Sequence, residues 1–213
     1  MKTALVLDVV ASRTHSDQRR LLGGVEARVQ QVLVQEGAAV SAAATTGDEL
    51  QALYAADDTG EAVRDLVRLR LLLRAAPPGE RAVDLRAGIG VGEVVADAPD
   101  DAGAPGQSGS AWWHARDALQ EAGRRRNGWP DRRMWLASDR PDAAVWNTAL
   151  IGLDVLLAGF DETDVVATLG LLDGATAAQV AEDLRLAPSS LSERLHRHGV
   201  YGVVRAVEVL ADR

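Results

Sequence analysis

The amino-acid sequence predicts an α+β protein: a sheet-forming domain over residues 1–140, followed by an all-α domain over residues 141–213. Short apolar runs of strand length alternate with helical periodicity up to Pro141, and beyond Pro141 every apolar repeat has helical spacing. Hydrophobic residues make up 47% of the 213 residues, which is enough for a packed core and too many for a disordered chain.

The first domain begins with a strand, a helix and a hairpin. Residues 3–10 form an apolar run that is typical of a buried central strand, and residues 16–35 repeat valine and leucine at helical spacing. Two short apolar runs, 38–45 and 50–54, flank a Gly-Asp pair. Such a pair between strand-like runs is typical of a hairpin turn.

A second helix, a glycine-rich strand and a closing helix–strand pair complete this domain. The leucines of residues 62–73 have helical spacing, and residues 82–95 alternate apolar with small residues, which indicates a strand that something approaches closely. A polar segment over residues 97–109 precedes a helix over 110–126 and a short strand over 133–137. This split βαβ order predicts a ferredoxin-like, antiparallel βαββαβ sheet with two helices on one face.

The second domain is expected to contain a helix-turn-helix. A connector over residues 143–157 leads to a helix that ends at Gly174, and helices over 176–184, 188–198 and 200–210 follow. The candidate DNA-binding residues on the exposed side of the second helix of the motif are Ser189, Ser190, Ser192, Arg194 and Arg197.

Two features of this segment favour the alternative, a purely structural or protein-binding helical domain. Arg185 occupies the turn position that glycine usually holds, and residues 161–213 carry a net charge of −4. Both interpretations stay open from the sequence.

The composition excludes several classes of protein. The 23 basic and 31 acidic residues give a net charge of −8, so the chain lacks the positive field that drives unselective binding to nucleic acid or anionic membrane. The absence of cysteine excludes disulfides, thiolate nucleophiles and iron–sulfur clusters. Because the longest apolar runs are short and each contains an aspartate, we expect no membrane contact and a cytoplasmic location.

Three carboxylates are candidate metal ligands. Asp8 lies inside the apolar first strand, where an unpaired carboxylate is costly to bury, and Asp48 and Glu49 lie at the hairpin. In a ferredoxin-like sheet the hairpin neighbours the first strand, so the three side chains could converge on Mg²⁺ or Mn²⁺, which prefer oxygen ligands. The alternative is that Asp8 pairs with Arg86 or Arg116 and that the Gly-Asp pair is an ordinary turn.

Four segments resemble the SatD family of small bacterial proteins. They are Leu7-Asp8-Val9-Val10-Ala11-Ser12-Arg13, Thr46-Gly47-Asp48-Glu49-Leu50-Gln51, Leu85-Arg86-Ala87-Gly88-Ile89-Gly90-Val91-Gly92-Glu93 and Trp113-His114-Ala115-Arg116-Asp117-Ala118-Leu119. The resemblance covers most of the chain, including the helix-turn-helix-like segment. It implies the architecture and no defined activity.

The same segments resemble, more distantly, class III nucleotidyl cyclases, whose first strand and hairpin carry metal-binding aspartates and whose later helix carries Asn and Arg. Asp8, Asp48 and Arg116 fall on these positions, but Trp112 stands in place of the Asn. The resemblance therefore implies that ligand binding persists where cyclisation is lost. The turn after the first strand also precedes a helix, where backbone N–H groups favour phosphate. The candidate ligand-binding residues are Ser12, Arg13, Arg86 and Arg116.

Aromatic residues cluster at the junction of the two domains. The five tryptophans are expected to form the apolar interface between the domains, and His114 to be a hydrogen-bonded packing residue. Cyclase-like domains commonly share a site across a two-fold axis, so the helix over residues 110–126 is expected to line a homodimer interface.

We therefore expect a cytoplasmic bacterial regulator, in which a cyclase-like domain senses a nucleotide with a divalent metal and a helix-turn-helix responds on DNA. One alternative is a metal-dependent nucleotidyl or phosphoryl transferase built on Asp8 and Asp48. The other is an inactive scaffold, which an Asp8 sealed against an arginine would favour.

Overall fold

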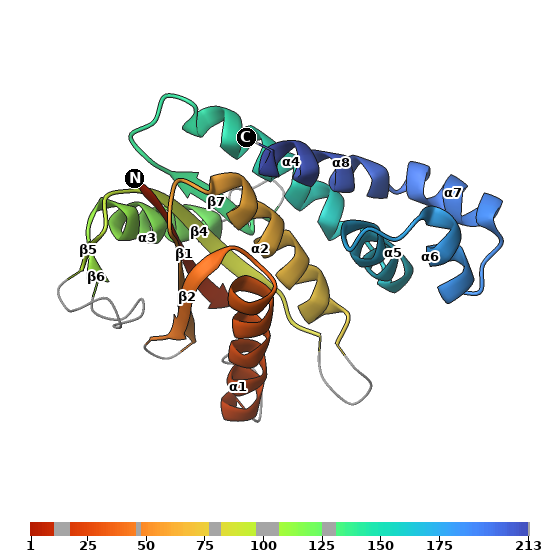
Figure 1. Cartoon of the computed structure of the whole chain (residues 1–213), viewed down its shortest axis with the longest axis horizontal. Helices are drawn as coiled ribbons and strands as arrows, with labels where there is room; N and C mark the ends of the chain where they lie inside the picture. The colour runs from red at the N-terminus through yellow and green to blue at the C-terminus, as the bar shows by residue number, and fades with distance from the viewer. Residues whose placement is uncertain (11–17, 46–47, 77–81, 97–106, 125–130, 213) are drawn as a thin grey trace.

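The structure, a computed structural model, describes residues 1–10, 18–45, 48–76, 82–96, 107–124 and 131–212. Within these residues a five-stranded mixed sheet with its helices is followed by a C-terminal helical region (Figure 1). The predicted α+β class is confirmed, with a sheet and its helices in the first part of the chain and helices alone in the last part.

The main sheet has the strand order β2-β3-β1-β4-β7. Its strands are β1 (Lys2–Val9), β2 (Ala39–Ala44), β3 (Glu49–Tyr54), β4 (Leu85–Gly92) and β7 (Met134–Ala137). The first four strands pair antiparallel, but β7 runs parallel to β4. The prediction of a wholly antiparallel sheet is therefore wrong at this edge, because a helical crossover returns the chain to the end of the sheet at which β4 began.

Helices cover both faces of the sheet. One face packs against α1 (Gln18–Val29), its π-helical continuation η2 (Gln30–Gln35) and α2 (Thr59–Arg74), in a cluster that includes Leu5 and Leu7 of β1. The other face packs against α3 (Ser110–Gly123), in a cluster that includes Ala4 and Val6. The alternation along β1 thus places the first two helices on one face, as predicted, and the third helix on the opposite face.

The glycines of β4 allow α3 to lie directly on the sheet. A Cβ atom added to Gly88 would lie 1.9 Å from the carbonyl oxygen of Ala115, and one added to Gly90 would lie 2.0 Å from that of Ala111. The close approach that the sequence predicted is therefore the backbone of α3. The predicted strand over residues 82–95 is interrupted after Gly92, and β5 (Val95–Ala96) pairs separately with β6 (Gln107–Ser108).

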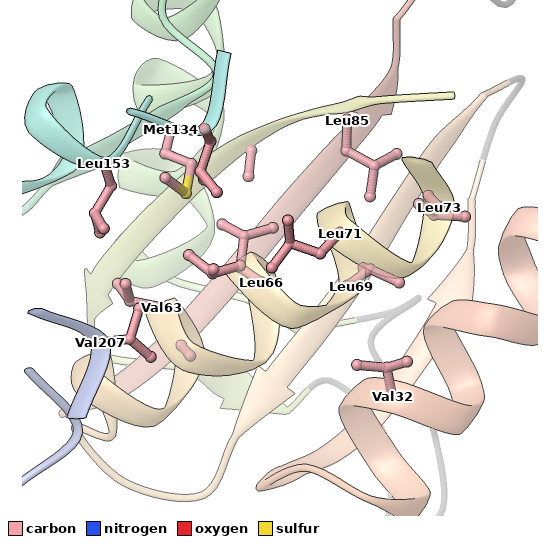
Figure 2. Packing of buried hydrophobic residues seen from close by; sticks show 14 of the residues in the cluster. Val32, Val63, Leu66, Leu69, Leu71, Leu73, Leu85, Met134, Leu153 and Val207 are labelled. Atoms are coloured by element: carbon pink, nitrogen blue, oxygen red, sulfur yellow. The ribbon is translucent and has the colours of Figure 1, made fainter. Parts of the chain in front are cut away.

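The C-terminal helices share one hydrophobic core with the sheet. They are α4 (Ala143–Ala158), α5 (Glu162–Leu172), α6 (Ala177–Asp183), α7 (Pro188–Arg197) and α8 (Val200–Ala211). Figure 2 shows Leu66 of α2 among Leu153 of α4, Val207 of α8 and Met134 of β7. The segment over 143–157, expected only as a connector, is thus a helix whose apolar side completes the core across the predicted boundary at residue 140.

A buried ion pair joins the sheet, α2 and α4. The Arg70 side chain is 3% exposed and donates to Asp84 through two nitrogens and to Asp154 Oδ1 at 2.7 Å. Asp154 Oδ2 accepts the backbone N–H groups of Arg133 and Met134 at the start of β7. Burial raises the pKa of Asp154 in spite of the Arg70 charge.

The tryptophans do not form one interface between the two parts. Trp112 packs on the α3 side of the sheet and Trp146 in the main core, whereas Trp113 is 65% exposed. Trp129 lies outside the described residues. His114 is partly buried, and its Nδ1 lies 2.9 Å from the carbonyl oxygen of Val91, as expected of a packing residue.

Candidate functional site

A polar cluster lies on the α3 face of the sheet, at the end of β1. In the strand register Asp8 is opposite Glu49 of β3 on one side and Arg86 of β4 on the other. Residues directly opposite in neighbouring strands point to the same face. By the alternation along β1, Asp8 shares the face of Ala4 and Val6, which α3 covers.

Two arginines approach the two carboxylates without close hydrogen bonds. Arg86 Nη2 lies 3.7 Å from Asp8 Oδ2, and Arg116 Nη2 of α3 lies 3.6 Å from Glu49 Oε1. Charged hydrogen bonds are about 2.7–2.9 Å long, as in the pair of Arg70 with Asp154 at 2.7 Å. The side chains of Asp8, Arg86 and Glu49 are partly exposed, and that of Arg116 is exposed. Asp8 is thus paired with an arginine but not sealed against it.

Glu49 is held in position by its neighbours. Thr45 Oγ1 lies 3.3 Å from Glu49 Oε1, and Gln51 Nε2 donates to the same oxygen at 3.1 Å. Gln51 is buried. These contacts fix the Glu49 carboxylate beside the arginine of α3. They come from both sides of the predicted hairpin, because Thr45 follows β2 and Gln51 lies in β3.

Two N–H donors on the α3 side of the protein have no hydrogen-bond partner within the described residues. They are Arg86 Nε and Trp112 Nε1, and both atoms are buried. Buried polar atoms in native proteins usually have partners. This part of the protein therefore combines two guanidinium groups with unsatisfied N–H donors, which is a chemistry suited to an anion.

The three carboxylates predicted as metal ligands, Asp8, Asp48 and Glu49, are not gathered into one group in the part of the chain that the structure describes. Asp48 lies in the turn before β3, and no group of three or more His, Cys, Asp or Glu side chains there could hold a metal ion. Asp8 and Glu49 remain adjacent on the sheet. Ser12 and Arg13, the predicted phosphate-binding pair, lie outside the described residues.

The second candidate site is the pair of helices α6 and α7, at the end of the molecule that is farthest from the sheet in Figure 1. Val180 and Ala181 of α6 and Leu191 and Leu195 of α7 are buried against the core, as the predicted helix-turn-helix requires. In the turn, Arg185 has φ +55°. This is the left-handed conformation that glycine adopts most easily. Arg185 therefore has the backbone conformation of the glycine that usually holds this turn position.

The predicted DNA-binding residues divide into two groups. Ser189, Ser190 and Arg197 are exposed, and Arg197 pairs with Glu193 one turn earlier. Ser192 and Arg194 are partly buried. Pro188 begins the helix, so the two exposed serines lie in its first turn, where hydroxyl groups can contact phosphate.

Arg194 is engaged within the protein. Its Nε donates to Asp164 Oδ1 at 2.8 Å and its Nη2 pairs with Asp161. Asp164 is fully buried, and its Oδ2 lies 2.8 Å from His198 Nδ1. Burial opposes ionisation of Asp161, but the N–H of Asp164 and the Arg194 guanidinium hold its pKa below the usual value. Arg194 therefore fixes α7 to the start of α5.

A pocket that the sequence did not indicate lies between α2 and α4. It has a volume of about 320 Å³ and is lined by Asp57, Thr59, Gly60, Arg140, Asp142 and Trp146. Arg140 bonds both aspartates, so the charged groups of the pocket largely satisfy one another. The one signal of this pocket in the sequence is the short spacing between Arg140 and Asp142, which is compatible with a polar contact between them.

Comparison with known proteins identifies the family and nothing finer. The model of the SatD family matches residues 3–212, nearly the whole chain. The chain therefore belongs to the SatD family. No curated protein and no solved structure matches it. Among the described residues, no helix is both long and apolar enough to cross a membrane.

Proposed function

We propose that this member of the SatD family is a cytoplasmic regulator that binds an anionic ligand of the nucleotide class on the α3 face and binds DNA through α6 and α7. One observation carries the ligand-binding part. Arg86 and Arg116 lie beside Asp8 and Glu49 at a partly exposed position, at distances that leave both guanidinium groups without a close carboxylate bond.

The chemistry of the cluster suits a phosphate group with a divalent cation. A guanidinium binds phosphate through two parallel hydrogen bonds, and a phosphate at this point would compete with Asp8 and Glu49 for the two guanidinium groups. Mg²⁺ usually uses one or two protein carboxylates together with the phosphates of its ligand. Asp8 and Glu49 would then supply the protein ligands of a Mg²⁺ or Mn²⁺ ion that enters with the nucleotide.

The topology supports the resemblance to nucleotidyl cyclases. The strand order β2-β3-β1-β4 is that of a ferredoxin-like sheet, and Asp8 lies on its central strand. Trp112, which stands at the position of the cyclase Asn, packs in the apolar cluster under α3. We therefore propose binding without cyclisation.

A thermal-shift screen of nucleotides with and without Mg²⁺ or Mn²⁺ tests the ligand site. A ligand at 100 times its Kd stabilises the folded state by about 2.7 kcal/mol, which raises the Tm of a protein of this size by roughly 5–10 °C. We expect Arg86→Gln to abolish the nucleotide-dependent shift and Asp8→Asn to abolish its metal dependence. Arg205→Gln, which removes an exposed arginine of α8, is the matched control. Equal shifts in Arg86→Gln and wild type would place any nucleotide elsewhere.

The DNA-binding part of the proposal is supported by the geometry of α7. Arg197 and the two exposed serines lie on its outer side, whereas Arg194 acts as a positioning residue through Asp164. We expect Arg197→Ala to weaken binding to promoter DNA from the protein's own locus and to lower the slope of log K against log salt by about one. Arg194→Ala should instead lower the Tm of the free protein.

Glu193→Gln is the matched control, because it removes the partner of Arg197 and makes α7 less acidic. It should leave DNA binding intact or strengthen it. If the protein bound no DNA with salt-dependent affinity at low ionic strength, that result would contradict the DNA-binding role. The ligand site would then remain a separate question.

A further inference from the structure

The outer face of α4 carries no charged side chain. The sole charged residue of this helix is Asp154, which points inward and is buried against Arg70. We propose that this face pairs with α4 of a second copy of the chain, antiparallel and across a two-fold axis.

Four of the exposed residues of α4 form a stripe along the helix, and the other exposed residues, Ala144, Leu156 and Ala158, are also uncharged. Val145 is 62% exposed and Val155 48%, and Thr148 and Gly152 are exposed between them. The spacing of three, four and three residues keeps these positions on one side of a helix and is the spacing of a helix–helix contact. Exposed valines at two ends of an uncharged stripe are apolar surface that the single chain leaves in water.

The charge of the chain makes an uncharged stripe a favourable surface for the approach of two copies. Each copy carries a net charge of −8, so most approaches of one copy to another are opposed by repulsion. The stripe on α4 contributes no charge to either partner. A partner with a strongly charged surface would gain nothing from it, whereas a second copy presents the same uncharged face.

No contact among the described residues requires a glycine at position 152, as is also the case for Gly23, Gly24 and Gly202 inside other helices. A glycine inside a helix costs about 0.5–1 kcal/mol relative to alanine. A Cβ atom added to Gly152 would meet no described atom within 4 Å. By contrast, a Cβ added to Gly60 would lie 1.9 Å from the carbonyl oxygen of Leu210, so close packing requires that glycine. The open space at Gly152 leaves room for a second helix to approach the backbone of α4 closely.

The stripe is complementary to itself in the antiparallel orientation. Val145 and Val155 are equally distant from position 150, and so are Thr148 and Gly152. When two copies of α4 pair antiparallel about that position, each Val145 faces the partner's Val155 and each Thr148 faces the partner's Gly152. Interfaces with two-fold symmetry require this self-complementarity.

The size of the helix sets the expected strength of the dimer. A helix of 16 residues is about 24 Å long, and a pair of such helices covers less than the roughly 800 Å² per partner of a standard interface. We therefore expect a reversible dimer with a Kd in the micromolar range.

Sedimentation velocity of the full chain from about 1 to about 100 μM measures this equilibrium. Val145→Glu and Val155→Arg should each weaken the dimer at least about tenfold, because an unpaired charge would face a valine. The double variant should recover most of the affinity, since each introduced carboxylate then faces the introduced guanidinium of the partner. Circular dichroism and the Tm at low concentration should be unchanged, because both positions are exposed in the monomer.

Two control variants separate this surface from others. Val40→Arg places the same charge on an exposed valine of β2, and Trp113→Arg places it on the exposed side of α3. Neither should weaken the dimer. The proposal is overturned by a monomer at every concentration, by a dimer that Trp113→Arg dissociates and the α4 variants do not, or by a double variant no stronger than the single ones.

Discussion

Replacing Asp154 with alanine is expected to lower the free energy of unfolding by about 4 kcal/mol. The substitution leaves two backbone N–H groups, those of Arg133 and Met134, without the acceptor that now lies 2.7 and 3.0 Å away. Each unsatisfied backbone group costs about 1–2 kcal/mol, and the lost bond to a charged group costs about as much again. Arg70 keeps its two bonds to Asp84, so its charge stays paired and the loss does not grow further.

Urea unfolding followed by circular dichroism measures this loss, and Asp173→Ala is the matched control. Asp173 also pairs with an arginine, Arg68, at 3.0 Å, but its side chain is 53% exposed. Exposed pairs of this kind contribute roughly 0–1 kcal/mol. If Asp154→Ala cost no more than Asp173→Ala, the buried carboxylate would not join α4 to the start of β7 as the structure indicates.

Three further substitutions test separate parts of the fold. Gly88→Ala should destabilise the protein by at least about 1–3 kcal/mol, because its Cβ would lie 1.9 Å from the carbonyl oxygen of Ala115; a Tm equal to that of the control Gly24→Ala would contradict the packing of α3. Arg185→Gly should raise stability by about 1 kcal/mol, because φ +55° strains a side-chain-bearing residue, and a lower Tm would show that the arginine has contacts that outweigh this strain. Burial raises the pKa of Asp65 above its ordinary value of 3.8, so the folded state holds that proton more tightly than the unfolded state. The stability from that proton is present below pH 3.8 and is lost as the pH rises through the raised pKa. Urea unfolding at a series of pH values should show a smaller loss of stability with rising pH for Asp65→Asn than for wild type. Parallel curves of unfolding free energy against pH for the two proteins would refute the role of Asp65.

The candidate ligand site was partly predictable. Asp8 stood out in the sequence because a carboxylate inside an apolar strand needs a partner, and both predicted arginine partners lie in the cluster, Arg86 on Asp8 and Arg116 on Glu49. The role of Glu49 as the partner of the second arginine was not predictable. It depends on the register between β1 and β3, two strands that no turn joins because a helix and β2 lie between them in the chain.

The role of Arg194 also depended on tertiary contacts. Arg194 and Arg197 are three residues apart on α7, and both were predicted to contact DNA. In the structure Arg194 reaches Asp161 and Asp164, which lie 33 and 30 residues earlier in the chain. Local spacing predicts which face of a helix a residue lies on. It does not predict which carboxylate from a distant part of the chain contacts that face.

The sequence by itself determined the order of the strands of the main sheet and of every helix but α4, because hydrophobic periodicity and turn residues act over a few neighbouring positions. It also determined the family, the acidic charge and the absence of thiol chemistry. Tertiary structure decided the parallel edge strand β7, the packing of α3 on the glycines of β4 and the single core that unites both predicted domains. These features arise from contacts between residues far apart in the chain, where burial of shared apolar surface and pairing of buried charges select one arrangement among many with the same local pattern.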